Sequence, residues 1–420
     1  MQYGLIGEKL GHSYSVEIHG MISDEPYELR EIPREELEGF LRERDFRGIN
    51  VTIPYKQAVM PYLDEISETA RAIGAVNTVV NRGGRLKGYN TDCDGLTRLI
   101  RRVCPDIRGK KVLIAGTGGT SRTAAYAAGQ LGAAQVIRMS RSGKEGAVRY
   151  EDAAREHGDA EIIINTTPCG MFPDNGGKPL ELEAFPKVQA VIDAVYNPLR
   201  TRLVLEAMDK DIPAEGGLFM LAAQAVRAAE LFRDTQFPPE TAERVWDAVR
   251  RMKENTVLIG MPGSGKSAVA AALGRMTGRP VVDTDAKIVQ AAGMEITEIF
   301  RTLGEAAFRE METKVIRECG RKAGIIISTG GGAPMRRENV DALRQNGRIV
   351  LLERPLSELM PTDDRPLGNT REKLETLYRE RMPVYRAAAD CAVPVEGTAE
   401  DVAGIIWGLS DRPQTPSERI

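Results

Sequence analysis

The stretch that decides the fold of the second half of the chain is Val257–Ser267, VLIGMPGSGKS. Within it, GMPGSGKS fits the pattern G-x-x-x-x-G-K-[S/T] completely, after an apolar strand and before the helical run AVAAALGRM. In such a P-loop, backbone N–H groups wrap the β-phosphate, the lysine reaches the β- and γ-phosphates, and the serine ligates Mg²⁺. A glycine-rich turn without a ligand is the alternative, and the complete pattern disfavours it. The expected ATP contacts are Gly263, Ser264, Gly265, Lys266, Ser267 and Ala268, with Lys266 catalytic.

A second glycine loop lies upstream, in Val112–Arg122, VLIAGTGGTSR. It follows a strand and opens a helix, as a dinucleotide fingerprint does, but Ser121 replaces the last glycine of G-x-G-x-x-G. The next strand ends VIRMSRSGK, with no Asp or Glu to bind an adenosine ribose 2′-hydroxyl. Arg141, with Lys144 close behind, instead favours a 2′-phosphate, so NADP is expected rather than NAD. The alternative is a solvated basic turn.

Composition limits the classes of function. The chain has 420 residues, 42% hydrophobic and 28% charged, with a net charge of −3. The length predicts roughly two to four globular domains, and the charge predicts no nucleic-acid or membrane partner. No apolar run approaches the roughly 18 residues that span a bilayer. The five cysteines form no C-x-x-C pair, so neither a disulfide framework nor a zinc site is indicated. We expect a cytoplasmic protein with small-molecule substrates; a homo-oligomer is compatible with the sequence.

Short apolar runs alternate with helical patterns throughout, which predicts an α/β protein with buried parallel strands. Helices are expected at residues 121–131 and 297–319. A helical segment and the charged run RRMKEN precede the strand that leads into the P-loop. Because that loop follows the first strand of its sheet, we place one domain at 1–253 and a P-loop domain at 254–420.

Residues downstream of the P-loop indicate the phosphoryl acceptor. Asp283 and Asp285, in VVDTD, follow a strand, where one carboxylate would hold water on Mg²⁺ and the other would accept a hydroxyl proton. Arg309, the STGGGAP turn and Arg381 follow, with the arginine-bearing DDRPLGNTR as a candidate lid. The alternatives are a solvated helix start for the aspartates, a surface charge for Arg309 and a bare tight turn for the glycines.

These motifs resemble shikimate kinase in their order and spacing, from Thr256 to about Trp407. The resemblance implies that Asp285 grips shikimate hydroxyls and acts as the base. One departure is RPLG where the family usually has RPLL. The other implied roles are carboxylate binding by Arg309 and Arg381, contact with ring hydroxyls by Gly331, the metal site at Ser267 and Asp283, and charge stabilisation on ATP by Arg365.

The first hundred residues carry a second set of polar side chains. Ser13 and Ser15 lie two apart in GHSYSVEIH, Lys56 ends GINVTIPYK, and Asp92 lies in GYNTDCDGL. Beside a dinucleotide domain, a lysine and an aspartate suit ketone reduction, because the ammonium polarises the carbonyl and donates a proton while the carboxylate orients it. The alternatives are surface residues and helix-capping serines.

Together HS-x-S, NVTIPYK, AVNT, NTD-x-x-G, GTGGTSR, NTTPCGM and AQA resemble shikimate dehydrogenase, from Met1 to about Phe237. The resemblance implies a substrate lobe at about 1–100 plus 218–250, a Rossmann NADP lobe at about 101–217, and Lys56 with Asp92 as the catalytic pair. Departures are Val16 in place of proline, a short stretch before YELREI, and MSRS in place of NRT. The implied substrate residues are Ser13, Ser15, Thr52, Asn77 and Gln224, and the implied cofactor residues are Gly116, Gly118, Gly119, Thr120, Ser121, Arg122, Tyr196 and Gly217.

The whole chain resembles a fused shikimate dehydrogenase and shikimate kinase. It would reduce 3-dehydroshikimate with NADPH and phosphorylate the resulting shikimate with ATP and Mg²⁺, on the route to aromatic amino acids. One alternative is an NAD-dependent quinate/shikimate dehydrogenase fused to a kinase for another small polyol. A binding protein without chemistry is a further alternative, and the presence of Lys56, Asp92, Lys266 and Asp285 disfavours it.

Overall fold

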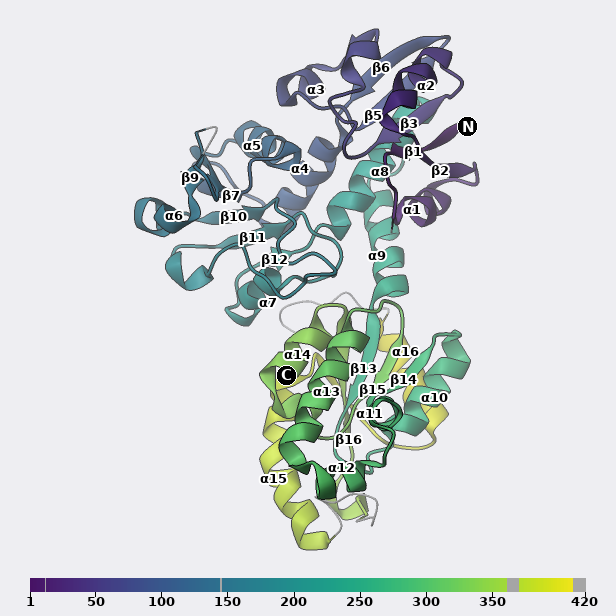
Figure 1. Cartoon of the computed structure of the whole chain (residues 1–420), viewed down its shortest axis with the longest axis vertical. Helices are drawn as coiled ribbons and strands as arrows, with labels where there is room; N and C mark the ends of the chain where they lie inside the picture. Colours follow the sequence, from purple (N-terminus) through teal and green to yellow (C-terminus); the bar gives the residue numbers. More distant parts are fainter. Residues whose placement is uncertain (12, 144–145, 361–369, 411–420) are drawn as a thin grey trace. The chain divides into compact units, whose positions relative to one another are not determined.

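The computed structural model describes residues 1–11, 13–143, 146–360 and 370–410. The chain divides into two compact units, Met1–Val249 and Arg250–Ile420, each with its own sheets and core (Figure 1). Helix α9 (Thr241–Lys253) contains the point of division. Within these described ranges, none of the helices combines the length and the apolar character needed to cross a membrane.

The first unit begins with a mixed six-stranded sheet of order β2-β1-β3-β5-β6-β4. β1 pairs in parallel with β2 and β3, but β5 is antiparallel to β3 and to β6, so the prediction of parallel strands throughout is wrong here. A two-residue turn at Gly83 and Gly84, with φ of 58° and 86°, joins β5 to β6 as a hairpin. The strands are β1 (Tyr3–Gly7), β2 (Tyr27–Glu31), β3 (Gly48–Val51), β4 (Glu65–Ile66), β5 (Thr78–Arg82) and β6 (Arg85–Tyr89).

Helices cover both faces of this sheet. On one face Ile6, Ile49 and Leu86 pack with buried residues of α2 and α3. On the other face Gly48 lies against α8, and a Cβ at Gly48 would come within 2.2 Å of the Phe232 ring, so no side chain fits there. The helices of this part are α1 (Ser15–Ile22), α2 (Leu37–Glu43), α3 (Glu68–Ile73), α4 (Thr91–Val103) and α8 (Leu218–Arg233).

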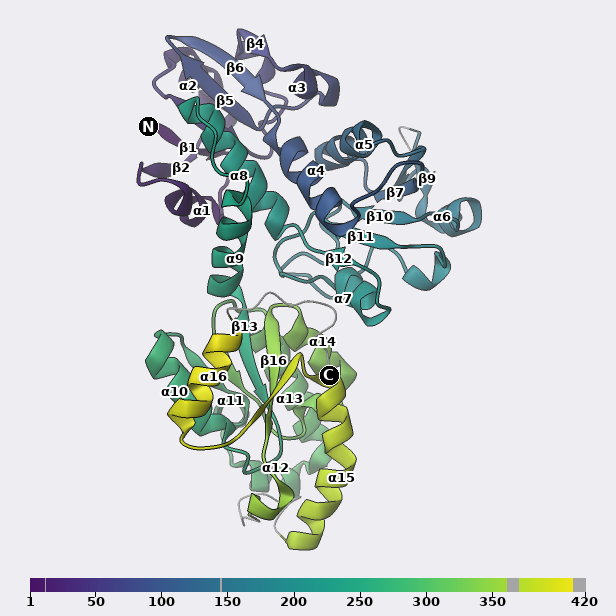
Figure 2. The same cartoon turned by 180° about the vertical axis from the view of Figure 1, so that it is seen from behind.

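The second sheet of the first unit is parallel throughout, with order β12-β11-β10-β7-β8-β9 (Figure 2). Alternate residues of β7 face opposite sides: Val112 packs toward α4, α5 and α8, and Leu113 toward α6 and α7. This is the doubly wound arrangement that places ligands at the carboxyl ends of the strands. The elements are β7 (Lys111–Ala115), α5 (Gly119–Gln130), β8 (Gln135–Ser140), β9 (Val148–Arg149), α6 (Tyr150–His157), β10 (Ile162–Asn165), β11 (Ala190–Asp193), α7 (Arg202–Asp209) and β12 (Ala214–Glu215).

The second unit is built on a five-stranded parallel sheet of order β14-β15-β13-β16-β17. Leu258 and Val350 pack against α10 and α16 on one face, and Val257 packs toward α11 to α15 on the other. The elements are β13 (Asn255–Ile259), α10 (Lys266–Thr277), β14 (Val281–Asp283), α11 (Thr284–Ala292), α12 (Ile296–Thr302), α13 (Gly304–Gly320), β15 (Ile326–Ser328), α14 (Arg337–Arg344), β16 (Gly347–Glu353), α15 (Arg371–Ala388), β17 (Cys391–Pro394) and α16 (Ala399–Ser410).

The α/β fold class is confirmed, and two helix predictions need correction. Residues 297–319 form two helices instead of one, because Gly304 adopts φ +84° and the chain turns there between α12 and α13. α5 begins at Gly119, two residues earlier than expected, so part of the glycine loop itself forms the first turn of the helix.

Candidate active sites

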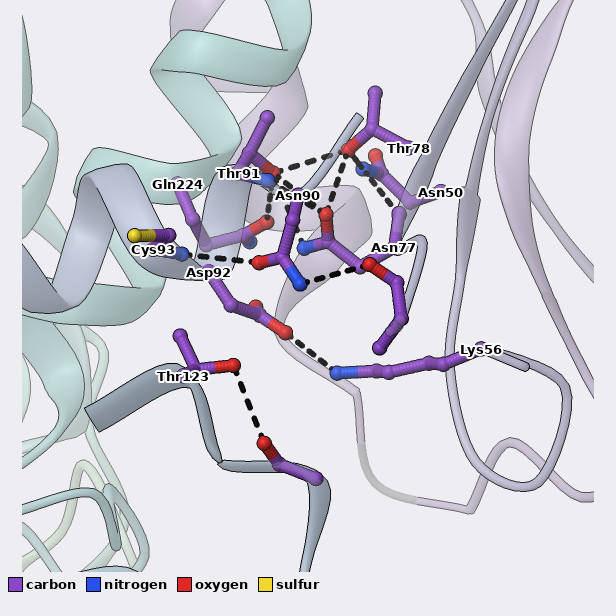
Figure 3. A network of polar contacts seen from close by, with 12 residues as sticks. Asn50, Lys56, Asn77, Thr78, Asn90, Thr91, Asp92, Cys93, Thr123 and Gln224 are labelled. Carbon is purple, nitrogen blue, oxygen red and sulfur yellow. Dashed lines mark hydrogen bonds and ion pairs between the residues drawn. The ribbon is translucent and has the colours of Figure 1, made fainter. Parts of the chain in front are cut away.

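Lys56 and Asp92 form a close ion pair in the first unit. Lys56 follows β3, and Asp92 lies in the first turn of α4, where Asn90 caps the helix by accepting from the Cys93 N–H at 3.1 Å. Lys56 Nζ lies 2.6 Å from Asp92 Oδ2, and Figure 3 shows the two side chains pointing toward each other. The lysine and aspartate side chains are 27% and 17% exposed, so both remain accessible to a ligand.

A buried polar network behind this pair orients two of the expected substrate amides (Figure 3). The Thr91 N–H donates to Asn77 Oδ1 at 2.7 Å, and Asn77 Nδ2 donates to Thr91 Oγ1 at 3.1 Å. Thr91 Oγ1 lies 3.3 Å from Gln224 Oε1. Thr78 Oγ1 lies 2.9 Å from Thr91 Oγ1 and accepts from Asn50 Nδ2 at 3.0 Å. Sequence reasoning missed Thr78, Thr91 and Asn50, although the repeated Asn-Thr pair in AVNT and YNTD was a signal.

The serine loop after β1 lies next to a tyrosine from the loop after β11 of the Rossmann sheet. Ser13 Oγ donates to Ser15 Oγ at 2.9 Å, so the two hydroxyls lie together as expected. Between them, the ring of Tyr14 contacts the ring of Tyr196 with centroids 5.4 Å apart. Burial raises the pKa of Tyr14 to about 12, with Tyr196 and Glu17 adding to the effect. Thr52 lies beside the end of β1, where a Cβ at Gly7 would come within 2.7 Å of its methyl group.

The first glycine loop is shaped for close approach of a ligand to the start of α5. Gly116 has φ +111°, and a Cβ there would come within 2.8 Å of Thr166 Oγ1. Cβ atoms at Gly118 and Gly119, by contrast, would meet nothing within 4 Å. Ser121 is buried and donates to Gly116 O at 2.6 Å, so its hydroxyl closes the loop where the fingerprint has a glycine. Helix N-termini of this kind bind phosphate groups.

The other expected cofactor residues lie around this loop. Thr120 lies in the first turn of α5, and Arg122 Nε is buried with no hydrogen-bond partner among the described residues. Arg141 is exposed directly after β8, where a ribose phosphate would lie. The Gly217 N–H donates to Val195 O at 2.8 Å, and a Cβ there would come within 2.2 Å of Ala194 O. Gly217 therefore lies directly against the segment that carries Tyr196.

In the second unit, the P-loop has the backbone of a phosphate cradle. Gly263 and Gly265 adopt φ of 83° and 92°, which favours glycine at both positions. Lys266 Nζ donates to Gly260 O and to Met261 O, both at 3.0 Å, which holds the ammonium across the loop. Ser264 Oγ is buried, with no hydrogen-bond partner among the described residues. Ala268 follows in the first turn of α10.

The two aspartates of VVDTD take different structural positions. Asp283 is the N-cap of α11: its Oδ1 accepts from the N–H groups of Asp285 and Ala286 at 3.0 and 3.2 Å. Its Oδ2 accepts from Ser267 Oγ at 3.0 Å, which joins the two expected metal residues. Asp285 lies in the first helical turn rather than on an extended strand, yet both aspartates line the same cavity.

This cavity, of about 420 Å³, brings together residues far apart in the sequence. P-loop residues line it together with Asp285, Arg309 and Arg381, as the sequence analysis expected. The expected Arg365 lies outside the described residues. Apolar side chains that were not predicted complete the wall: Ile296, Phe300, Phe308 and Leu377.

Expected site residues lie against the three glycines of STGGGAP, and no side chain fits at Gly330 or Gly332. A Cβ at Gly330 would come within 2.4 Å of Asp285 Oδ1, and one at Gly332 within 1.9 Å of Arg309 Nη1. At Gly331 it would lie 3.4 Å from Arg381 Nη1. The turn is therefore a close-packed wall of the cavity.

Glu312 is a buried partner of Arg309 that sequence reasoning missed. Arg309 Nη1 donates to Glu312 Oε2 at 2.8 Å, and Arg309 Nη2 donates to the more exposed Glu305 at 3.0 Å. Burial raises the pKa of Glu312 more than Arg309 lowers it, and Asp285 adds to the rise. The signal was present in FREME, since a Glu three residues after an Arg faces it on a helix.

Comparison with known proteins identifies the family of the first unit. Residues 5–79 match the family model of the shikimate dehydrogenase substrate binding domain. The NADP(+) shikimate dehydrogenase of Clostridium perfringens (strain SM101 / Type A) is 35% identical over 265 residues, which cover 59% of this chain and 98% of that protein. The chain belongs to the shikimate dehydrogenase family. We call Met1–Val249 the dehydrogenase unit.

Solved structures agree with this assignment. A chorismate mutase/shikimate 5-dehydrogenase fusion protein from Clostridium acetobutylicum is 32% identical, with a TM-score of 0.56, and the match covers 59% of this chain and 96% of that one. Shikimate 5-dehydrogenase from Thermus thermophilus, in complex with NADP(H) and shikimate, is 33% identical, with a TM-score of 0.52 and coverage of 59% and 99%.

The remainder of the chain belongs to a second enzyme class. Residues 262–407 match the family model of shikimate kinase, within the unit Arg250–Ile420, which we call the kinase unit. One chain therefore joins a shikimate dehydrogenase to a shikimate kinase, and the expectation of a fused enzyme is confirmed.

Proposed function

We propose that this enzyme reduces 3-dehydroshikimate to shikimate with NADPH, and then phosphorylates shikimate to shikimate 3-phosphate with ATP. The observation that carries the proposal is that Asp285, Arg309 and Arg381 line one cavity with the P-loop. Two arginines suit a carboxylate, and a carboxylate suits hydroxyls, so the acceptor is a small anionic polyol. Shikimate fits this description, and it is the product that the dehydrogenase unit would deliver.

In the dehydrogenase unit, Lys56 acts on the ketone oxygen. Its ammonium polarises the carbonyl and donates a proton to the oxygen as hydride reaches the carbon, and Asp92, 2.6 Å away, holds the ammonium in place. In the reverse direction Lys56 accepts the hydroxyl proton. The hydroxyl and carboxylate groups of the substrate are held by Ser13, Ser15, Thr52, Asn77 and Gln224.

NADPH supplies the hydride when bound. The residues present fit a dinucleotide: α5 begins at Gly119 with open space beyond Gly118, and the buried Nε of Arg122 lacks a protein partner in the described chain. The guanidinium of Arg141 would bind the 2′-phosphate. Gly217 packs against the segment that carries Tyr196, and both residues would border the nicotinamide. Gly116, Thr120 and Ser121 complete the wall around the diphosphate.

In the kinase unit, Lys266 would neutralise charge on the β- and γ-phosphates of ATP, and the P-loop N–H groups would wrap them. Asp285 would accept the proton of the attacking shikimate hydroxyl, while Arg309 and Arg381 fix the carboxylate. Gly331 would contact ring hydroxyls, and Arg365 would stabilise transferring charge. The residues fit Mg²⁺, because Ser267 and Asp283 offer the oxygen ligands that it prefers, and bound Mg²⁺ would neutralise phosphate charge.

A second candidate function keeps the fold and changes both substrate and cofactor. A quinate dehydrogenase from Corynebacterium glutamicum in complex with NAD is 29% identical, with a TM-score of 0.52, so the same fold serves quinate and NAD in that protein. An exposed arginine after β8 favours NADP here.

The test is to incubate the protein with 3-dehydroshikimate, NADPH, ATP and Mg²⁺ and to identify the products by mass spectrometry. Shikimate 3-phosphate is the expected product, and omission of ATP should stop the sequence at shikimate. A parallel panel of quinate with NAD and of other polyols with ATP separates the second candidate. Faster turnover of quinate with NAD than of shikimate with NADP would contradict the proposal.

A further inference from the structure

Asp193 is the last residue of β11, and its side chain is fully buried in the dehydrogenase unit. The carboxylate accepts three hydrogen bonds. Oδ1 accepts from the Val195 N–H at 2.9 Å and from Asn165 Nδ2 at 3.0 Å, and Oδ2 accepts from Thr201 Oγ1 at 2.7 Å. The proposed chemistry does not use this carboxylate directly.

The bonds to Val195 and Thr201 close the loop that carries Tyr196. Both ends of this loop, residues 194–201, are fixed by one carboxylate. Thr201 also caps α7 by accepting from the Val204 N–H at 3.3 Å. The loop in turn supports two neighbours: Val195 O accepts from the Gly217 N–H, and the Tyr196 ring contacts Tyr14. Displacement of the loop would therefore move several expected ligand contacts together.

The third bond reaches the turn after β10. Asn165 Oδ1 accepts from the N–H and the hydroxyl of Thr167 at 3.0 and 2.7 Å. The residue between them, Thr166, donates to Ala115 O at 2.6 Å, and its Oγ1 lies against Gly116 of the dinucleotide loop. Asp193 thus connects the dinucleotide loop, through Asn165, to the loop with Tyr196.

We propose that Asp193 is a positioning residue of the dehydrogenase: its ionised carboxylate sets the position of Tyr196 and Gly217 relative to the dinucleotide loop. This inference rests on the proposed function of that unit. An ionised carboxylate can accept all three bonds. A protonated Oδ2 would instead donate to Thr201 Oγ1, which already accepts from the Val204 N–H, so the Thr201 hydroxyl would have to turn its own proton away from the carboxylate. The ionisation of Asp193 therefore affects the position of the loop at residues 194–201 as well as the stability of the dehydrogenase unit.

The charge state of Asp193 changes in an accessible range. Burial raises its pKa to about 6, against the lowering effect of the three hydrogen bonds. Among the described residues, the Cys169 thiol is a titratable neighbour of Asp193, and burial raises the pKa of this thiol, so it is neutral near pH 6. Below pH 6 the protonated side chain should hold the loop less firmly, and kcat/KM of the dehydrogenase should fall.

The test compares Asp193→Asn, which keeps the shape but presents an NH₂ donor, with the unaltered chain. We expect kcat/KM for shikimate with NADP⁺ to fall by roughly tenfold or more at pH 8, since small errors in position are costly. The inflection near pH 6 should disappear. Kinase activity on added shikimate should stay unchanged in the same preparation. A variant that keeps kcat, KM and the inflection would overturn the inference.

A second pair of variants covers the case in which Asp193→Asn does not fold. Thr201→Ser keeps the hydroxyl that donates to Asp193, and Thr201→Val removes it. The serine variant should have near-native kinetics, and the valine variant should lose kcat/KM in the folded fraction, with a changed pH profile. If both lose activity only in proportion to unfolded protein, the role is merely structural. If the unaltered chain lacks shikimate-dependent NADP⁺ reduction, the proposed function fails instead.

Discussion

The rings of Tyr14 and Tyr196 meet edge to face, with centroids 5.4 Å apart and planes at 60°. One ring comes from the loop after the first strand of the substrate sheet, and the other from the loop after β11 of the Rossmann sheet. Because Tyr14 lies between Ser13 and Ser15, this contact joins the proposed shikimate hydroxyl site to the proposed nicotinamide side of the dehydrogenase.

We predict that Tyr14→Ala raises KM for shikimate in the dehydrogenase reaction. An aromatic pair of this geometry contributes about 0.5–1.5 kcal/mol beyond its buried area, which corresponds to roughly 2- to 12-fold. Tyr14→Phe is the matched control, since it keeps the ring, and steady-state kinetics of both variants is the measurement. Equal losses in the two variants would show that the hydroxyl matters and that the ring contact does not.

Arg141 is predicted to set the preference for NADP over NAD. It is exposed directly after β8, and Arg141→Asp replaces a cation facing the 2′-phosphate by an anion. The ratio of kcat/KM for NADP⁺ to that for NAD⁺ should fall by about 10- to 100-fold. Arg155→Asp, at an exposed position on α6, is the control and should leave the ratio unchanged. A parallel loss with both cofactors would reject this role.

His19 should make the dehydrogenase unit sensitive to acid. It is buried and stacked on Tyr27, and burial, followed by the nearby Arg233, lowers its pKa to about 3. In the unfolded chain its pKa is near 6.5, so the unfolded state binds more protons between pH 6.5 and pH 3. The contribution of neutral His19 to the free energy of unfolding is therefore complete above pH 6.5. It is lost as the pH falls, by at most about 1.4 kcal/mol per pH unit.

His19→Phe, which keeps a ring in the stack, should remove this part of the acid sensitivity. The chain has two tryptophans, and in a Trp407→Phe background Trp246 alone reports unfolding of the dehydrogenase unit. The measurement is the urea midpoint at pH 7 and pH 5 with and without His19→Phe. The raised pKa of Asp193 changes stability with pH in the direction opposite to that of His19. This contribution is present with and without His19→Phe, so it cancels when the two pH dependences are compared. Identical pH slopes would contradict the prediction.

Glu312 is predicted to control shikimate binding in the kinase unit. Its side chain is 1% exposed and pairs with Arg309, so Glu312→Gln removes the buried one of the two carboxylates that neutralise this guanidinium. KM for shikimate in the kinase reaction should rise about tenfold or more, with KM for ATP nearly unchanged. Glu305, the other partner of Arg309, is 52% exposed. Glu305→Gln should therefore weaken shikimate binding by less than about 1 kcal/mol. Equal increases in KM for shikimate in the two variants would contradict the prediction that the buried Glu312 matters more to Arg309 than the exposed Glu305.

Loops whose backbone conformation requires glycine were predictable from the sequence, because few other residue types adopt positive φ or leave room for a close contact. The glycine patterns located both the P-loop and the loop at Gly116. In the structure, glycines of these loops have positive φ or lie in close contact with neighbouring atoms. Asp285 follows β14 at the carboxyl edge of the parallel sheet, where ligands of such folds bind, and Arg309 of α13 and Arg381 of α15 line the same cavity.

Features that depend on tertiary contact were not predictable in this way. The spacing of Arg309 and Glu312 predicts that they pair on a helix, but it does not predict that Glu312 is buried beside the cavity. The antiparallel direction of β5 follows from the turn at Gly83 and Gly84, and local hydrophobicity does not encode strand direction. Asp193 ends an apolar run, and the three donors that converge on it come from residues 165, 195 and 201, whose proximity only the fold creates.

The two active sites should be silenced independently. Lys56→Ala removes the proposed proton donor, and loss of general acid–base catalysis costs roughly 10²–10⁴-fold in rate, so NADPH oxidation should collapse. The same protein should still phosphorylate added shikimate. Lys266→Ala should do the reverse, because it removes the cation on the β- and γ-phosphates, and it should accumulate shikimate from 3-dehydroshikimate and NADPH.

Mixing the two variants is the decisive experiment, with products identified by mass spectrometry. Shikimate released by the Lys266→Ala protein can enter the kinase unit of the Lys56→Ala protein, so shikimate 3-phosphate should reappear. Lys9→Ala and Lys373→Ala, outside both proposed sites, serve as controls and should retain both activities. If Lys56→Ala abolishes phosphorylation of added shikimate while the protein remains folded, the assignment of two separate sites is wrong. If each variant behaves as expected and only the mixture yields no product, shikimate does not exchange between molecules, and transfer within one chain becomes the required explanation.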